Sequence, residues 1–149
     1  MKTAYLSLSA ASDYFATRLN TQAWDSASDE NAENALIMAT EAIDCLNFYG
    51  KKAVESQDHQ FPRYGDTLVP QDIQEACADI AIRLLDGVDP ELEMENLTMT
   101  SQGYANVKST YDRSTPPEHI VAGILSITAW RKIKPYLLDS RSVTINRVS

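Results

Sequence analysis

Residues 28–50 read SDENAENALIMATEAIDCLNFYG, and this stretch indicates most clearly that the chain is helical. Its apolar residues recur every three or four positions, the spacing that places side chains on one face of an α-helix. Ser28 can cap the start of this helix, and Gly50 suits a residue just past its end. We therefore expect a helix of about five turns, whose apolar stripe comprises Ala32, Ala35, Leu36, Ala39, Ile43 and Leu46 and is broadened by Ile37, Met38 and Phe48.

Three other segments have a helical pattern, and together they predict a mainly α chain. The first covers residues 9–19, and the next covers residues 70–86, which start at a proline and are followed by Gly87. The last covers residues 115–134 and opens with Thr-Pro-Pro-Glu, a pattern that caps a helix start. The four segments predict a four-helix bundle-like domain over residues 1–138.

Three stretches between and after these helices lack helical periodicity. Residues 88–115, before the last helix, favour an extended or β arm, and residues 139–149 favour an extended C-terminal tail. Residues 51–69 form an ordered loop, in which Phe61, Pro62 and Arg63 are the structural residues. We expect Arg63 to fix this loop through hydrogen bonds to carbonyls or to a carboxylate. A short polar link holds Trp24, which we expect to pack as an anchor.

The net charge of −8 is distributed unevenly along the chain. Residues 1–100 hold 6 basic and 18 acidic side chains, giving −12, whereas residues 101–149 hold 7 and 3, giving +4. An acidic body is poorly suited to broad binding of nucleic acid, because neutralisation of phosphates dominates that affinity. The asymmetry favours self-association or a charged protein partner, or it only aids solubility.

The cysteines and the hydropathy pattern indicate the cellular compartment in which the protein is expected. Cys45 and Cys77 lie in apolar helical patterns without CxxC spacing, so we expect buried, reduced thiols. The start of the chain lacks the apolar core of a secretory signal, and the longest apolar-rich stretch, residues 120–130, is too short to span a membrane. We therefore expect a protein without a membrane span that stays in a cytoplasm.

Residues able to perform chemistry are sparse. His59 and His119 lack metal-ligand spacing and are expected at the surface, and no phosphate-binding or nucleophile motif is present. We therefore predict no catalytic, cofactor or metal site and no enzyme activity. An acidic run predicts a solvated face, or a surface for a basic neighbour, rather than a cation site, and it comprises Asp86, Asp89, Glu91, Glu93 and Glu95.

Short sequence landmarks then follow one another in a recognisable order. The opening carries YLS at 5–7, ASDYFA at 11–16, RLN at 18–20 and AW at 23–24. Later landmarks are ALI at 35–37, AT at 39–40, ID at 43–44, FPR at 61–63, VP at 69–70, LLDG at 84–87 and VKSTY at 107–111. In this order the chain resembles a phage protein family often labelled DnaT-like single-stranded-DNA-binding. Members of that family are similar to the helical head-to-tail adaptors, or connectors, of tailed bacteriophages.

The resemblance implies a structural protein of the virion neck, assembled in the host cytoplasm. Such adaptors form a ring of twelve subunits beneath the portal, bind a tail or stopper protein, and surround DNA without reading its sequence. The wide apolar faces and the extended segments suit such a ring, since they can contact neighbouring chains. The residues we expect at these contacts are Tyr104, Val107, Tyr111, Trp130, Lys132, Lys134, Arg141, Val143, Ile145 and Arg147.

Two other functions stay open. A single-stranded-DNA-binding or primosomal module is suggested by the family's label and by the basic last third of the chain. Tyr104 and Tyr111 with Lys108 and Arg113 could stack bases, although strand pairing is the preferred interpretation. The other alternative is a small regulatory helical bundle that acts on a host protein.

Overall fold

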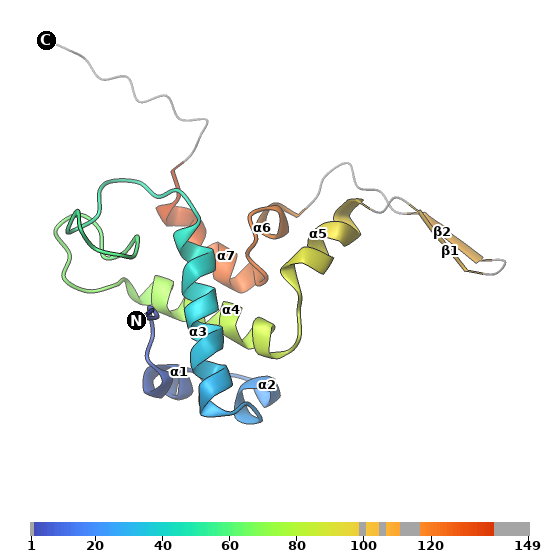
Figure 1. Ribbon diagram of the computed structural model, residues 1–149, viewed down its shortest axis with the longest axis horizontal. Coiled ribbons are helices and arrows are strands. Elements are labelled where there is room, and N and C mark those ends of the chain that lie inside the picture. The colour runs from blue at the N-terminus through green and yellow to red at the C-terminus, as the bar shows by residue number, and fades with distance from the viewer. Residues whose placement is uncertain (1, 99–100, 105–106, 111–116, 139–149) are drawn as a thin grey trace, which may run out of the picture.

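The computed structural model describes residues 2–98, 101–104, 107–110 and 117–138, and most of them are helical (Figure 1). The predicted mainly α class is therefore confirmed. The helices are α1 (Leu8–Phe15), α2 (Gln22–Asp25), α3 (Asp29–Asp44), α4 (Gln71–Leu85), α5 (Pro90–Thr98), α6 (Glu118–Val121) and α7 (Ile127–Ile133). A short 3₁₀ helix, η1 (Lys134–Tyr136), follows α7, and the strands are β1 (Ser101–Tyr104) and β2 (Val107–Thr110).

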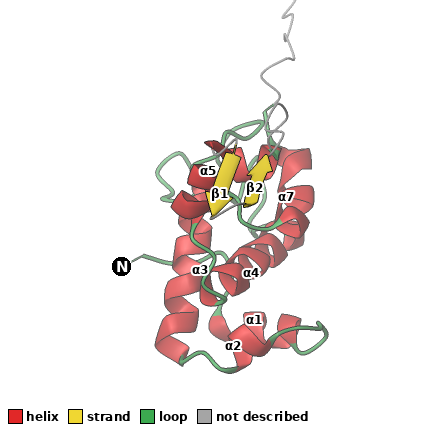
Figure 2. Ribbon diagram, turned by 90° about the vertical axis from the view of Figure 1, so that its right-hand side faces the viewer, coloured by secondary structure: helices red, strands yellow, loops and turns green. Residues whose placement is uncertain are grey.

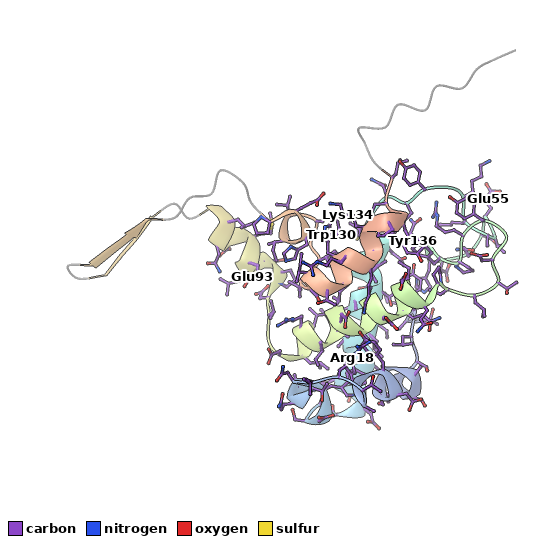
Figure 3. The ribbon with its side chains drawn as sticks, turned by 180° about the vertical axis from the view of Figure 1, so that it is seen from behind. Arg18, Glu55, Glu93, Trp130, Lys134 and Tyr136 are labelled. Atoms are coloured by element: carbon purple, nitrogen blue, oxygen red, sulfur yellow. The ribbon has the colours of Figure 1, made fainter. Side chains whose placement is uncertain are left out.

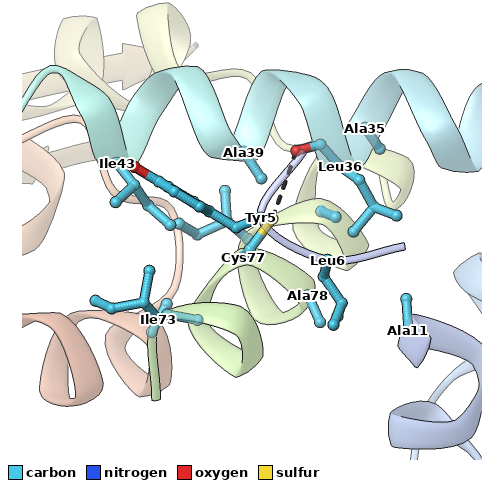
Figure 4. Close-up of a cluster of buried hydrophobic side chains, with 14 of the residues drawn as sticks. Tyr5, Leu6, Ala11, Ala35, Leu36, Ala39, Ile43, Ile73, Cys77 and Ala78 are labelled. Carbon is cyan, nitrogen blue, oxygen red and sulfur yellow. Dashed lines mark hydrogen bonds between the residues drawn. The ribbon is translucent and has the colours of Figure 1, made fainter. Parts of the chain in front are cut away.

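The core lies between α3, α4 and α7, with α4 in contact with both of the others. Leu36 and Ile43 of α3 face Ile73 and Cys77 of α4, and all four side chains are almost completely buried (Figure 4). The Cys77 thiol donates to the Leu36 carbonyl over 3.4 Å. The Thr40 hydroxyl, also buried, donates to the same carbonyl and accepts from the Tyr5 amide. The few polar groups in this core are thus hydrogen-bonded, as burial requires.

Helix α3 ends earlier than the sequence predicted. Ser28 caps its start, since its hydroxyl accepts from the Asn31 amide over 3.2 Å, but the last helical residue is Asp44. The following residues pair with the segment after α7 instead: the Tyr49 amide donates to the Tyr136 carbonyl and the Leu138 amide to the Asn47 carbonyl. This long-range pairing overrides the local helical pattern. Cys45 is consequently exposed, so the prediction of a buried thiol is wrong there and holds only for Cys77.

The first predicted helix is also shorter than expected. Helix α1 is capped by Ser7, whose hydroxyl accepts from the Ala10 amide, and it ends at Phe15 instead of Leu19. The chain then turns through Asn20, which has a left-handed φ of 59°. This turn brings Trp24, in α2, against the ring of Phe15 at 4.7 Å between centroids. The predicted polar link therefore contains a short helix around a buried Trp24.

The last predicted helix, residues 115–134, is broken into α6 and α7, and its first two residues lie outside the described part of the chain. Gly123, with φ of 80°, reverses the direction after α6, a conformation that costs glycine little. Ile124 can then enter the core, where it is fully buried. Ser126 restarts the helix, since its hydroxyl accepts from the Ala129 amide over 3.2 Å. Burial of Ile124 thus outweighs the continuous helical pattern.

The predicted extended arm, residues 88–115, begins with a helix instead. Pro90 opens α5, and the Asp89 carboxylate caps it by accepting from the Glu91 amide over 2.9 Å. This pair of residues is a helix start signal that the sequence analysis missed. Strands β1 and β2 then pair antiparallel, with Ser101 opposite Thr110 and Tyr104 opposite Val107. Figure 2 views the molecule from the side of this hairpin, with the helices behind it.

Candidate interaction surfaces

The hairpin is the first candidate surface, because it stands apart from the helical body (Figure 1). Among the described residues, each strand of this two-stranded sheet pairs on one side only, so its other edge has no partner strand there. Tyr104 and Val107, both predicted contact residues, lie opposite each other in the register at the turn end of the hairpin. The other predicted contacts, Tyr111 in the arm and Arg141, Val143, Ile145 and Arg147 in the tail, lie outside the described residues.

The three predicted contact residues of α7 and η1 are engaged within their own chain. Trp130 is 6% exposed, and its indole Nε1 donates to Glu118 of α6 over 3.3 Å. Lys134 donates to the same carboxylate over 3.0 Å and stays largely exposed (Figure 3). Lys132 reaches the opposite way, toward α1 and α4. The structure thus brings Trp130 and Lys134 together on α6 and places Lys132 in a separate cluster.

Lys132 lies at the centre of a polar cluster that joins α1, α4 and α7. Its ammonium donates to Tyr14 Oη and Asp79 Oδ2, each over 2.9 Å, and is 3.2 Å from Glu75 Oε2. Tyr14 Oη in turn donates to Asp79 Oδ1 over 2.9 Å. Burial lowers the pKa of Lys132, but the bonds to Tyr14 and Asp79 outweigh it and hold that pKa above its ordinary value. The charged Lys132 side chain therefore links the three helices through hydrogen bonds and ion pairs.

Glu75, in this cluster, makes the stability of the fold depend on pH. Burial opposes ionisation of Glu75, yet hydrogen bonds from Gln71 and Lys132 outweigh burial and lower the pKa of Glu75. A carboxyl whose pKa is lower in the folded state stabilises the fold above its unfolded pKa of about 4.3. That stabilisation is lost as the pH falls through the folded pKa.

Replacement of Glu75 with glutamine is expected to reduce the sensitivity of the fold to acid. Between about pH 6 and pH 3, the wild type should lose about 0.5 kcal/mol more free energy of unfolding than Glu75→Gln does. Urea unfolding followed by circular dichroism at several pH values measures this difference. The matched control is Glu33→Gln, because Glu33 is exposed on α3 and should leave the pH profile unchanged. Identical profiles for Glu75→Gln and the wild type would contradict the assignment.

Arg63 organises the loop between α3 and α4. It is 7% exposed, and its guanidinium donates to the carbonyls of Phe48, Tyr49, Gly50 and Gln60 and to the Gln60 side chain. The sequence analysis predicted bonds of this kind, because a planar fork of five N–H donors suits several carbonyls at once. Phe61, joined to Pro62 by a cis peptide bond, is buried among aromatic rings, which belong to Tyr5, Phe48 and Tyr136.

Asp44 holds the same loop against α3 and the start of the chain. Its Oδ2 lies 2.7 Å from His59 Nδ1, and its Oδ1 accepts from the Gln60 amide and the Tyr5 hydroxyl. The other ring nitrogen of His59 lies 2.8 Å from Thr3 Oγ1. Burial and the bond to Asp44 raise the pKa of Tyr5, so the hydroxyl stays protonated and donates. The His59 side chain was expected at the surface, but it is half-buried and takes part in the packing of this loop.

A groove of about 620 Å³ opens between α1, α4 and α7. Its walls include the Lys132 cluster, and its rim carries Arg18, Leu19 and Arg83. Leu19 is 89% exposed, and both arginines are exposed. Sequence reasoning missed this groove, because it depends on how three helices meet. The exposed Leu19 beside Arg18 was the available signal.

In the described residues, no group of three or more histidine, cysteine, aspartate or glutamate side chains is placed to hold a metal ion. Among the described helices, none has the length and apolar character needed to cross a bilayer. The polar clusters found here join elements of the fold to one another.

Comparison with known proteins gives one match. Residues 2–141 match the model of a family described as "Putative DnaT-like ssDNA binding protein". Neither a curated protein nor a solved structure matches the chain. The family match covers nearly the whole sequence, including the loop at Arg63, the groove and the hairpin. This chain therefore belongs to the DnaT-like single-stranded-DNA-binding family.

Proposed function

We propose that this chain is a head-to-tail adaptor of a tailed bacteriophage. In this proposal residues 1–138 form the adaptor domain of a virion neck, and residues 139–149 are a tail that contacts partners. Copies of the domain form a ring beneath the portal, around the channel through which DNA leaves during ejection. The protein then acts by adhesion, without catalysis and without a cofactor.

The observation that carries this proposal is the contrast between the helical body and the hairpin. The body already covers its own core, including Trp130 and Ile133 of its last helix. The hairpin stands apart from it, and within the part of the chain that the structure describes each of its strands is paired on one side only. Such an edge can bind a strand of another chain through backbone hydrogen bonds alone. An arm of this kind supports a role in assembly with neighbouring subunits, the portal or a tail protein.

Particle imaging tests the proposal. The purified chain is mixed with its cognate portal, sedimented, and examined by negative-stain microscopy. We expect co-sedimentation and a ring of about twelve subunits on the portal. A variant in which residues 101–110 are replaced by a Gly-Ser linker should keep its helical circular dichroism and lose the ring. Absence of binding by the intact chain would refute the adaptor function, and a ring from the linker variant would remove the hairpin from it.

The family description favours one alternative, a module that binds single-stranded DNA. Binding of this kind depends on neutralised phosphates and therefore falls steeply with salt. A gel shift with an unstructured oligonucleotide at about 50 and 200 mM salt separates the two functions. Tight binding at the lower salt that weakens by more than tenfold at the higher would support the alternative. The acidic adaptor is expected to bind little DNA at either concentration.

A further inference from the structure

The rim of the groove carries two exposed arginines, Arg18 and Arg83, beside the exposed Asp86. Lys132, inside the groove, is already paired with Asp79 and Glu75. Arg18 and Arg83 form no ion pair with any residue that the structure describes, and Arg18 lies over the ring of Tyr14 at 4.5 Å. A guanidinium held in this way is positioned to receive a carboxylate from outside the described chain.

An exposed apolar side chain lies beside these cations. Leu19 is 89% exposed, the most exposed large apolar residue among those described. The left-handed φ of 59° at Asn20 fixes the turn that presents it at the rim. This turn exposes Leu19 to solvent next to two arginines. The surface therefore offers an apolar contact together with positive charge. The chemistry that complements this surface is an acidic segment with exposed apolar side chains.

Helix α5 has that chemistry. Glu91 is exposed, Leu92 is 52% exposed and Met94 is 39% exposed. The helical period of 3.6 residues places Met94 about one turn after Glu91 on the same face, with Leu92 on the flank of that face, so the exposed face combines a carboxylate with an apolar side chain. Asp89, Glu93 and Glu95 add negative charge around this face. The acidic run in the sequence predicts either a solvated face or a surface for a basic neighbour.

The two surfaces do not cover each other within one chain. Leu19 and Leu92 both remain exposed in the folded chain. Figure 3 shows Arg18 beside α4 on the helical body and Glu93 on α5, toward the hairpin. Contact between the groove and α5 therefore needs two copies of the chain.

We propose that the acidic face of α5 in one copy docks at the groove of the next copy, with Glu91 against Arg83 and Arg18 and with Met94 against Leu19. The contact rests on the proposed ring, because it names the surfaces by which neighbouring subunits meet. It joins two different faces, so in a pair of copies one keeps a free groove and the other keeps a free α5. Repetition of such a contact gives a closed ring or an open filament.

Charge reversal in the full-length chain tests this pairing. Glu91→Arg alone and Arg83→Glu alone should each weaken self-association in sedimentation equilibrium by about tenfold or more, because each places like charges together. The two variants mixed in equal amounts should restore association, since the reversed helix then meets a reversed groove. The matched controls are Glu33→Arg and Lys51→Glu, which make the same charge changes at exposed positions elsewhere. Equal effects of test and control variants, or no recovery in the mixture, would overturn the pairing.

Disulfide trapping provides an independent measurement that does not depend on charge. One population carries Glu91→Cys and a mass tag, the other carries Arg83→Cys, and both carry Cys45→Ser because Cys45 is exposed. Mild oxidation of the mixture should trap tagged heterodimers well above the level given by a Glu33→Cys and Arg83→Cys pair. Equal trapping by the two pairs would overturn the contact.

Failure of this contact and failure of the adaptor function give different results. If the intact chain forms rings on the portal but charge reversal and trapping have no effect, the adaptor function stands and the α5 contact is wrong. If trapping succeeds and the intact chain never binds a portal, the contact between copies stands and the adaptor function is wrong.

Discussion

Replacement of Arg63 with alanine is expected to lower the free energy of unfolding by about 3–5 kcal/mol. The substitution removes the donor from four backbone carbonyls in a half-buried loop and leaves a space where the guanidinium was. A buried acceptor without a donor costs about 1–3 kcal/mol, although water entering the space recovers part of this. Chemical denaturation followed by circular dichroism measures the loss. It is large against a total stability that is about 5–15 kcal/mol for a typical domain.

Two variants serve as controls for the Arg63 prediction. Arg83→Ala removes an exposed arginine that forms no ion pair with a described residue, and it should change stability by less than about 0.5 kcal/mol. Arg63→Lys keeps the charge but loses the planar fork, so it should retain only part of the stability. If Arg63→Ala unfolds within about 1 kcal/mol of the wild type, the loop does not depend on this side chain.

Replacement of Trp130 with alanine is expected to lower the free energy of unfolding by about 3–5 kcal/mol, the usual cost of emptying a buried aromatic site. Trp130 is 6% exposed, and its neighbours in α7, Ala129 and Ile133, are fully buried. The sequence analysis placed this residue at a contact between subunits, where its loss would weaken assembly and leave the monomer stable. The expected result is the reverse, with a destabilised monomer. Thermal and urea unfolding of the isolated chain distinguish these outcomes.

The matched control for Trp130 lies in the same helix. Ile127 is 45% exposed at the start of α7, and Ile127→Ala should cost less than about 1 kcal/mol. A stable Trp130→Ala monomer that no longer forms rings would return this residue to the subunit interface.

The four long helical segments could be predicted from the sequence, because apolar spacing and capping residues act locally. Ser28 caps α3 as predicted, and the stripe that includes Leu36, Ala39 and Ile43 faces the core. The errors arose where distant contacts decide the local structure. Helix α3 ends at Asp44 because residues 47–49 pair with residues 136–138, and the last helix breaks at Gly123 because Ile124 enters the core.

The candidate surfaces were only partly predictable for the same reason. Arg63 could be predicted as a structural residue of the loop. The 19 residues of this loop, 51–69, contain a single arginine and few other residues that could fix its shape. The Lys132 cluster joins residues from three helices far apart in the sequence, and no spacing rule predicts such a meeting. Trp130 and Lys134 were placed at an interface, but both contact Glu118 of the same chain. The apolar face of α7 is wider than one stripe because the helix makes a second contact. That contact lies within its own chain.

The pairing of residues 47–49 with residues 136–138 also sets when the protein can finish folding during its synthesis. Helices α3 and α4 are synthesised first, but the loop that leaves α3 lacks these partners until residues 136–138 have left the ribosome. The Phe48–Leu137 bridge therefore delays closure of the body until the segment after α7 has been synthesised. A shorter nascent chain cannot yet present a finished body.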